Sequence, residues 1–171
     1  MSTKKHPVVL FKTNMGDMRV ELYPEKAPLT VKNFLDYVAD GHYNNTIYHR
    51  VIDNFMIQGG GFNKDFEQKP TKAAVKNEAE NGLKNERGTI AMARTNDIHS
   101  ATSQFFINVA NNDFLDFKSK APHEYGYCVF GKVIEGMEVV DKMRKTKTGA
   151  KGPHRDVPVE TIEILSAELA H

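Results

Sequence analysis

Few residues in the chain have the types and spacing needed for nucleophilic or metal-dependent chemistry. None of the seven histidines is spaced His-x-x-x-His, and the single cysteine, Cys128, cannot supply a Cys-x-x-Cys pair. Ser100 and Ser103 lack the Gly-x-Ser-x-Gly turn that exposes a serine nucleophile. The glycines at 59–61 are not followed by Lys-Ser/Thr, so we expect a strand bulge there and not a phosphate loop. We therefore expect no metal, no cofactor and no covalent catalysis.

Two short predicted strands each combine a glutamine with a large apolar side chain on one face. Side chains alternate along a strand, so Met56 shares a face with Gln58, and Gln104 shares a face with Phe106. A core face excludes amides unless they are hydrogen-bonded. One interpretation is a solvent face, with Phe106 a stray aromatic and the nearby Arg50 in a surface ion pair. The residue pattern alone leaves this alternative open.

The elements that must position these residues are mainly strands. Segments rich in Gly, Asn, Asp and Ser punctuate the chain every ten to twenty residues, which is typical of an all-β protein. A hairpin is predicted first, with arms at 8–11 and 18–22 joined by a turn at 14–17. The other predicted strands are Ile47–Val51, Phe55–Gln58, Gly88–Ala93, Gln104–Asn108, Cys128–Val133 and Glu160–Leu165.

Two segments instead have helical spacing. One begins at Pro28, a residue favoured in the first helical turn, and ends before Gly41, which suits a helix C-terminus. Its apolar residues recur at i, i+3, i+4 and i+7: Val31, Phe34, Leu35 and Val38. The second spans about Glu135–Arg144. Many strands with two helices predict a barrel or a sandwich, and a closed barrel has the advantage of exposing no strand edge.

Composition excludes several classes of protein. The 171 residues suit a single domain, 1–171, with 40% hydrophobic and 26% charged residues. A net charge of +1 lacks the positive field of a dedicated nucleic-acid binder, and the basic stretch Lys142–Arg155 is expected to be a solvated loop, with nucleic-acid contact a distant alternative. The apolar run 8–11 is too short for a signal peptide or a membrane span. We expect a soluble cytoplasmic protein without nucleic-acid or membrane partners.

Five ordered sequence blocks resemble the cyclophilin family of peptidyl-prolyl cis–trans isomerases, in particular its bacterial cytoplasmic type. The similarity extends from Val8 to about Leu165. It implies the family fold, a mainly β, eight-stranded closed antiparallel β-barrel capped by two α-helices. The blocks are His49–Ile52, Phe55–Gly60, Gly88–Ala93, Ser103–Ile107 and Val129–Val133.

The resemblance also implies a role for individual residues. Arg50 matches the catalytic arginine of the family. Arg94 replaces a frequent asparagine, Phe114 replaces tryptophan in many relatives, and Tyr127 replaces a histidine at the pocket rim. The implied substrate-binding residues are Phe55, Met56, Gln58, Ala93, Arg94, Gln104, Phe106, Phe114, Leu115 and Tyr127.

The implied activity is cofactor-free rotation about Xaa-Pro bonds in proline-containing peptides and in unfolded or folding proteins. Phe114 lacks the indole N–H donor of tryptophan, so only weak binding of a cyclosporin-like ligand is expected. The alternative function is a proline-peptide-binding module or folding helper whose catalysis is incidental. Arg50 favours the enzyme, because binding alone does not require it.

Overall fold

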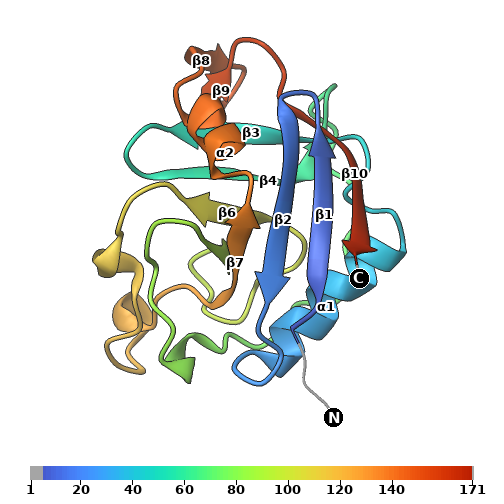
Figure 1. Cartoon of the computed structure of the whole chain (residues 1–171). Coiled ribbons are helices and arrows are strands. Elements are labelled where there is room, and N and C mark those ends of the chain that lie inside the picture. Colours follow the sequence, from blue (N-terminus) through green and yellow to red (C-terminus); the bar gives the residue numbers. More distant parts are fainter. Residues whose placement is uncertain (1–5, 171) are drawn as a thin grey trace.

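Eight antiparallel strands close into a barrel in the computed structural model, which describes residues 6–170 (Figure 1). Around the barrel the order is β1-β10-β3-β4-β6-β5-β7-β2, so closure pairs every strand on both sides. The predicted eight-stranded barrel is confirmed. Its strands are β1 (Val8–Thr13), β2 (Gly16–Leu22), β3 (Thr46–Ile52), β4 (Met56–Asn63), β5 (Thr89–Met92), β6 (Phe105–Asn108), β7 (Val129–Glu135) and β10 (Glu163–Ala170).

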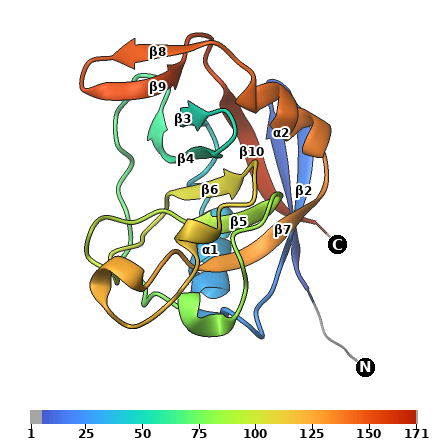
Figure 2. The ribbon, with the colours of Figure 1, turned by 90° about the vertical axis from the view of Figure 1, so that its left-hand side faces the viewer.

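The two predicted helices are α1 (Pro28–Ala39) and α2 (Met137–Arg144). They lie toward opposite ends of the barrel (Figures 1 and 2). Gly41 follows the end of α1 with a φ of 73°, the left-handed conformation that glycine adopts without strain. No helix in the described residues is both long and apolar enough to cross a bilayer. Three short 3₁₀ helices complete the fold: η1 (Ala79–Asn81), η2 (Asp113–Leu115) and η3 (Pro122–Glu124).

Aromatic rings fill the barrel interior around Phe105 of β6. Its ring centroid lies 5.5 Å from Tyr43, 5.6 Å from Phe11 and 5.7 Å from Phe34. Phe105 is completely buried, and Ile107 shares its face. Because side chains alternate along a strand, the intervening side chain of β6 points to the outer face of the barrel.

The glycines of β4 form the predicted bulge. Thr46 of β3 pairs with Asn63, but Tyr48 pairs with Gly59, so β4 uses more residues than β3 over the same length. Gly60 has a φ of 93°, a conformation that other residues rarely adopt. Beyond the bulge, Arg50 and Gln58 are register partners. The bulge therefore sets which β4 side chain lies beside Arg50.

A hairpin replaces the loop predicted in the basic stretch. Its strands are β8 (Thr148–Lys151) and β9 (His154–Pro158), which form a separate two-stranded sheet above β3 (Figure 2). The loop prediction was wrong because β8 carries no alternating apolar residues, and long-range packing stabilises the hairpin instead. The His154 ring lies 5.3 Å from Phe62 and 5.1 Å from Phe66.

Some predicted strand boundaries were also wrong. Phe55 lies in the turn before β4, and Gln104 lies just before β6. The last strand, β10, runs to Ala170 because it pairs along the whole of β1. Such shifts of a few residues are usual where pairing partners lie far away in the sequence.

Gly60→Ala tests how strongly the bulge is constrained. A Cβ at Gly60 would lie 2.8 Å from Tyr43 and 2.9 Å from Phe105, at an unfavourable φ. We expect a loss of about 2–4 kcal/mol in the free energy of unfolding, measured by urea denaturation. Gly149→Ala is the control, because its Cβ would come no closer than 4.0 Å to a neighbour. Equal stability of the two variants would contradict this account.

Candidate active site

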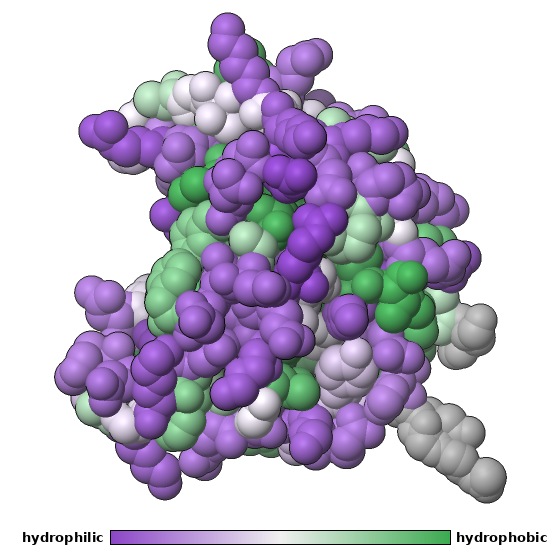
Figure 3. All heavy atoms as spheres, turned by 60° about the vertical axis from the view of Figure 1, so that its left-hand side comes forward, coloured by the Kyte–Doolittle hydropathy of each residue, from purple (hydrophilic) through white to green (hydrophobic). Residues whose placement is uncertain are grey.

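Four side chains lie in one row across the outer face of the barrel. Arg50 of β3 pairs with Gln58 of β4, Gln58 pairs with Phe106 of β6, and Phe106 pairs with Ala91 of β5. The row brings a guanidinium, an amide and an aromatic ring together. In the space-filling view the surface is mostly hydrophilic, and hydrophobic side chains are exposed where its left outline is hollowed (Figure 3).

A cavity of about 130 Å³ opens over this row. That is smaller than the roughly 300–1,000 Å³ of pockets for drug-sized ligands, and suits a single side chain. Every residue that lines it was a predicted site residue, whereas Gln104 and Phe114 lie outside the lining. The lining residues are Arg50, Phe55, Met56, Gln58, Ala93, Arg94, Phe106, Leu115 and Tyr127.

The floor and walls of the cavity are apolar. Met56, Phe106 and Leu115 are 2%, 4% and 9% exposed, and with Ala91 and Val129 they form a cluster separate from the main core. Phe106 is therefore not a stray surface aromatic. An apolar ring that entered this cavity would be removed from water, which favours binding by about 25 cal/mol per Å² buried.

Amide side chains hold the polar edge of the cavity. Arg50 Nη1 donates a long hydrogen bond of 3.5 Å to Gln58 Oε1, and Gln58 Nε2 donates to Gln104 Oε1 at 2.9 Å. Gly61 makes room for Gln104, since a Cβ there would lie 2.5 Å from its Cγ. Among residues 6–170 Arg50 has no carboxylate partner, so the surface ion pair considered above is wrong. The guanidinium keeps its charge and most of its donors for a ligand.

Arg94 also lines the cavity and is held in place by three hydrogen bonds. Its Nε and Nη2 donate to Gly126 O at 3.2 and 3.0 Å, and its Nη1 donates to Thr95 O at 2.8 Å. The guanidinium lies 4.6 Å from the Tyr127 ring centroid, within cation–π range. Arg94 thus ties the groove to the segment at 126–127.

The rim is completed by two further aromatic contacts. Phe114 is 64% exposed, and its ring lies 5.6 Å from that of Phe55. Tyr127 meets Phe106 edge-on at 5.7 Å. Phe114 therefore lies beside the cavity as an apolar surface and not as one of its walls.

Residues 8–169 match the family model described as "Cyclophilin type peptidyl-prolyl cis-trans isomerase/CLD". The chain belongs to the cyclophilin family. It is 57% identical to peptidyl-prolyl cis-trans isomerase B of Escherichia coli (strain K12), over 95% of this chain and 99% of that protein. It is also 56% identical to the isomerase cyp18 of Streptomyces antibioticus, over 92% and 95% of the two chains. The predicted isomerase activity is thereby confirmed at the level of the family.

Solved cyclophilin structures share the barrel. A cyclophilin-type isomerase of Cryptosporidium parvum aligns with a TM-score of 0.79 and 28% identity, over 97% of this chain and 98% of that one. The same protein in the presence of the dipeptide Ala-Pro aligns with a TM-score of 0.78 and 29% identity, over 96% and 99%.

The described residues of this cyclophilin bear on two other chemistries, metal binding and thiol nucleophilicity. No group of three or more His, Cys, Asp or Glu side chains among residues 6–170 is arranged to hold a metal ion. Burial raises the pKa of the Cys128 thiol to about 11, so the thiol is protonated and unreactive at neutral pH.

Buried asparagines fix two walls of the cyclophilin pocket through its backbone. Asn112 Nδ2 donates to Phe55 O at 2.8 Å, and Asn85 Nδ2 donates to Leu115 O at 3.1 Å. Asn108 connects the two, since its Nδ2 donates to Asn85 Oδ1 at 3.1 Å and its Oδ1 accepts from Asn112. The sequence analysis did not predict a role for these asparagines. The one available signal was Asn108, a polar residue directly after the apolar run 105–107.

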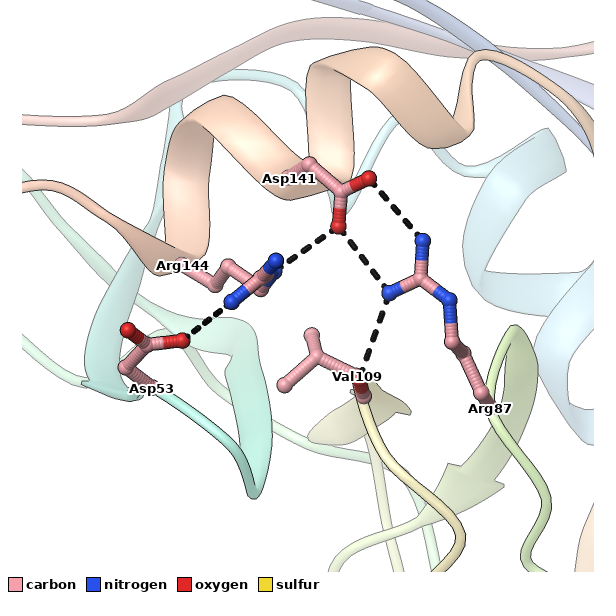
Figure 4. A network of polar contacts seen from close by, with 5 residues as sticks. All are labelled: Asp53, Arg87, Val109, Asp141 and Arg144. Carbon is pink, nitrogen blue, oxygen red and sulfur yellow. Dashed lines mark hydrogen bonds and ion pairs between the residues drawn. The ribbon is translucent and has the colours of Figure 1, made fainter.

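A network of ion pairs stabilises the turn between β3 and β4 (Figure 4). This turn carries Phe55, one of the residues that line the pocket. Arg144 of α2 contacts Asp53 of that turn at 2.5 Å and Asp141 at 2.8 Å. Arg87 forms a two-pronged pair with Asp141, at 3.0 and 2.9 Å, and also donates to Val109 O. Hydrogen bonds from Arg87 and Arg144 lower the pKa of Asp141 to about 2. Sequence reasoning missed this network too.

Asp141 makes the acid stability of this cyclophilin testable. Its pKa is lower in the folded chain than the usual 3.8, so its contribution is complete above that value and is lost as the pH falls toward 2. Asp141→Asn should therefore lose less stability than wild type between pH 5 and pH 2, measured as the urea midpoint. Glu138→Gln, an exposed change on the same helix, is the control and should follow wild type. Identical pH profiles for wild type and Asp141→Asn would contradict the assignment.

Proposed function

We propose that this chain accelerates cis–trans rotation about Xaa-Pro bonds with Arg50 as the catalytic residue and the adjoining cavity as the proline pocket. The observation that carries the proposal is that a guanidinium lies beside a small apolar cavity on one strand row. No carboxylate of residues 6–170 pairs with this guanidinium. The implied binding residues surround that cavity, apart from Gln104, which hydrogen-bonds Gln58, and Phe114 at the rim.

The reaction needs little beyond selective binding of a twisted peptide bond. Amide resonance creates a rotational barrier of about 18–20 kcal/mol, and uncatalysed Xaa-Pro exchange takes roughly tens to hundreds of seconds. A turnover near 10³ per second requires roughly a 10⁵-fold acceleration, or about 7 kcal/mol. Because no covalent bond is broken, neither a nucleophile nor a metal is required.

Arg50 supplies an interaction that exists only in the transition state. In the planar ground state the proline nitrogen shares its lone pair with the carbonyl, so it is a poor acceptor. Twisting localises that lone pair, and the guanidinium can then donate a hydrogen bond to it. Interactions that strengthen on reaching the transition state lower the barrier. Such a charge-assisted bond contributes about 1.5–3 kcal/mol in ordinary protein contexts.

The apolar walls account for the remaining stabilisation. By excluding water they strengthen the Arg50 interaction and favour the less polar twisted carbonyl. Met56, Phe106 and Leu115 grip the proline ring on one side of the bond while the other side turns. Ring burial is the same in both states, so it sets mainly KM.

Further proposals concern partners and location. We propose proline-containing segments of folding proteins as substrates, consistent with the Ala-Pro dipeptide named for the related Cryptosporidium structure. We propose the cytoplasm as the location, since Cys128 is an unpaired thiol and disulfides are rare there. A cyclosporin-like macrocycle should bind weakly, because Phe114 offers no N–H donor at the rim.

Arg50→Ala separates an isomerase from a peptide-binding module. We expect kcat/KM to fall about ten- to a hundredfold while peptide affinity stays within a few-fold, because the lost bond forms only in the twisted state. Arg50→Lys should restore little of the lost kcat/KM. The lysine ammonium lacks the planar set of N–H donors of the guanidinium and does not reach as far. Phe106→Ala should instead raise KM strongly. The measurement is exchange NMR on an Ala-Pro peptide below and above saturation, with circular dichroism to verify folding.

A folded Arg50→Ala variant with full kcat would show that the lone-pair mechanism is wrong. The groove would then be better described as a binding site with incidental catalysis.

A further inference from the structure

The two charged residues that line the proline pocket are both arginines. Arg50 and Arg94 contribute to the lining, whereas none of the other lining residues is Asp or Glu. Within residues 6–170 neither guanidinium is paired with a carboxylate, and their closest polar partners are the Gln58 amide and backbone carbonyls. The pocket mouth therefore has a positive charge that the described residues do not neutralise.

Arg94 is held as a ready-made anion receptor. Its three hydrogen bonds go to carbonyl oxygens, which fix the group without neutralising its charge. A guanidinium has five N–H donors, so two remain for a ligand. Stacking on Tyr127 holds the plane of the group, and binding an anion therefore needs little further ordering of the side chain.

The two acidic side chains that line a cavity together with Arg94 are hydrogen-bonded to other residues. Asp116 and Glu124 line a neighbouring cavity that shares Arg94. Asp116 is buried and accepts hydrogen bonds from the backbone and side chain of Asn85. Glu124 accepts from Ser119 Oγ at 2.7 Å. Among residues 6–170 no carboxylate is paired directly with Arg94, so a direct carboxylate partner would come from a bound peptide.

We propose that Arg94 is a specificity-determining residue that favours substrates with Asp or Glu immediately beside the proline. The inference rests on the proposed function, because it assigns a substrate class to the same pocket. The carboxylate would accept from the unused Arg94 donors while the proline ring occupies the apolar cavity. Since this contact is formed equally in ground and transition states, it should lower KM and leave kcat nearly unchanged.

Two peptide series test the proposal, one varying the residue before proline and one the residue after it, each with Glu, Gln or Lys. In at least one series we expect kcat/KM for Glu to exceed that for Gln by about three- to tenfold at low salt, with Lys poorest. The Glu-to-Gln ratio should fall toward one in 0.5 M NaCl, where screening is strong. It should also fall toward one in Arg94→Gln, whatever the absolute rate of that variant.

Lys26→Gln removes the same charge from an exposed position outside the pocket lining and should keep the wild-type ratio. Arg94→Lys should give an intermediate ratio, and the salt dependence of wild type tests the idea even if both Arg94 variants are unstable. Equal kcat/KM for Glu and Gln peptides in both series, or a ratio that survives Arg94→Gln, would overturn the proposal. Absence of activity on the Gln peptides would instead overturn the proposed function.

Discussion

Within residues 6–170 the guanidinium of Arg50 contacts an amide oxygen and no carboxylate, and the proposed chemistry of the site depends on that arrangement. A carboxylate at this position would form a salt bridge and occupy the donors that, in the proposed mechanism, bind the twisted proline nitrogen. Gln58 orients the guanidinium through one long bond and is itself held by Gln104. The arginine is thus positioned while its charge and most of its donors stay available.

The contact between Arg50 and Gln58 depends on the register of β3 and β4 in the barrel. The β4 bulge brings Gln58 opposite Arg50, and a slip of one residue would turn Gln58 toward the interior. The same alternation that buries Phe105 in the core exposes Phe106 to the pocket. Outside the sheet, buried asparagines and the network around Asp141 hold the turns that carry the remaining walls. Most of these supports act on backbone atoms, so they fix the pocket without entering it.

Turn residues and period-two alternation predicted the eight strands of the barrel, with boundaries wrong by a few residues. Alternation also predicted the shared faces of Met56 with Gln58 and of Gln104 with Phe106. Helical spacing and the flanking Pro28 and Gly41 predicted α1. Family resemblance, and not the pattern, distinguished Arg50 from an ordinary surface arginine, because nothing local marks its lack of a carboxylate partner. The β8–β9 hairpin and the buried asparagines could not be predicted, since their stability comes from neighbours distant in the sequence. For the same reason the pairing of Asp53 with Arg144, 91 residues apart, has no local signal.

The most direct measurement of the central claim is the pH dependence of kcat in Gln58→Glu. This change is nearly isosteric, but it places a carboxylate beside the guanidinium. At pH 7 we predict a loss of at least about tenfold in kcat on a neutral Ala-Pro peptide, with peptide affinity within a few-fold, because the ion pair would hold the Arg50 donors. Activity should partly recover only as the pH falls below about 4, because the ion pair lowers the pKa of the introduced carboxyl below its usual value of about 4.3. The measurement is exchange NMR on the folded variant. Wild-type kcat at pH 7 in that variant would contradict the claim that catalysis depends on an uncompensated Arg50.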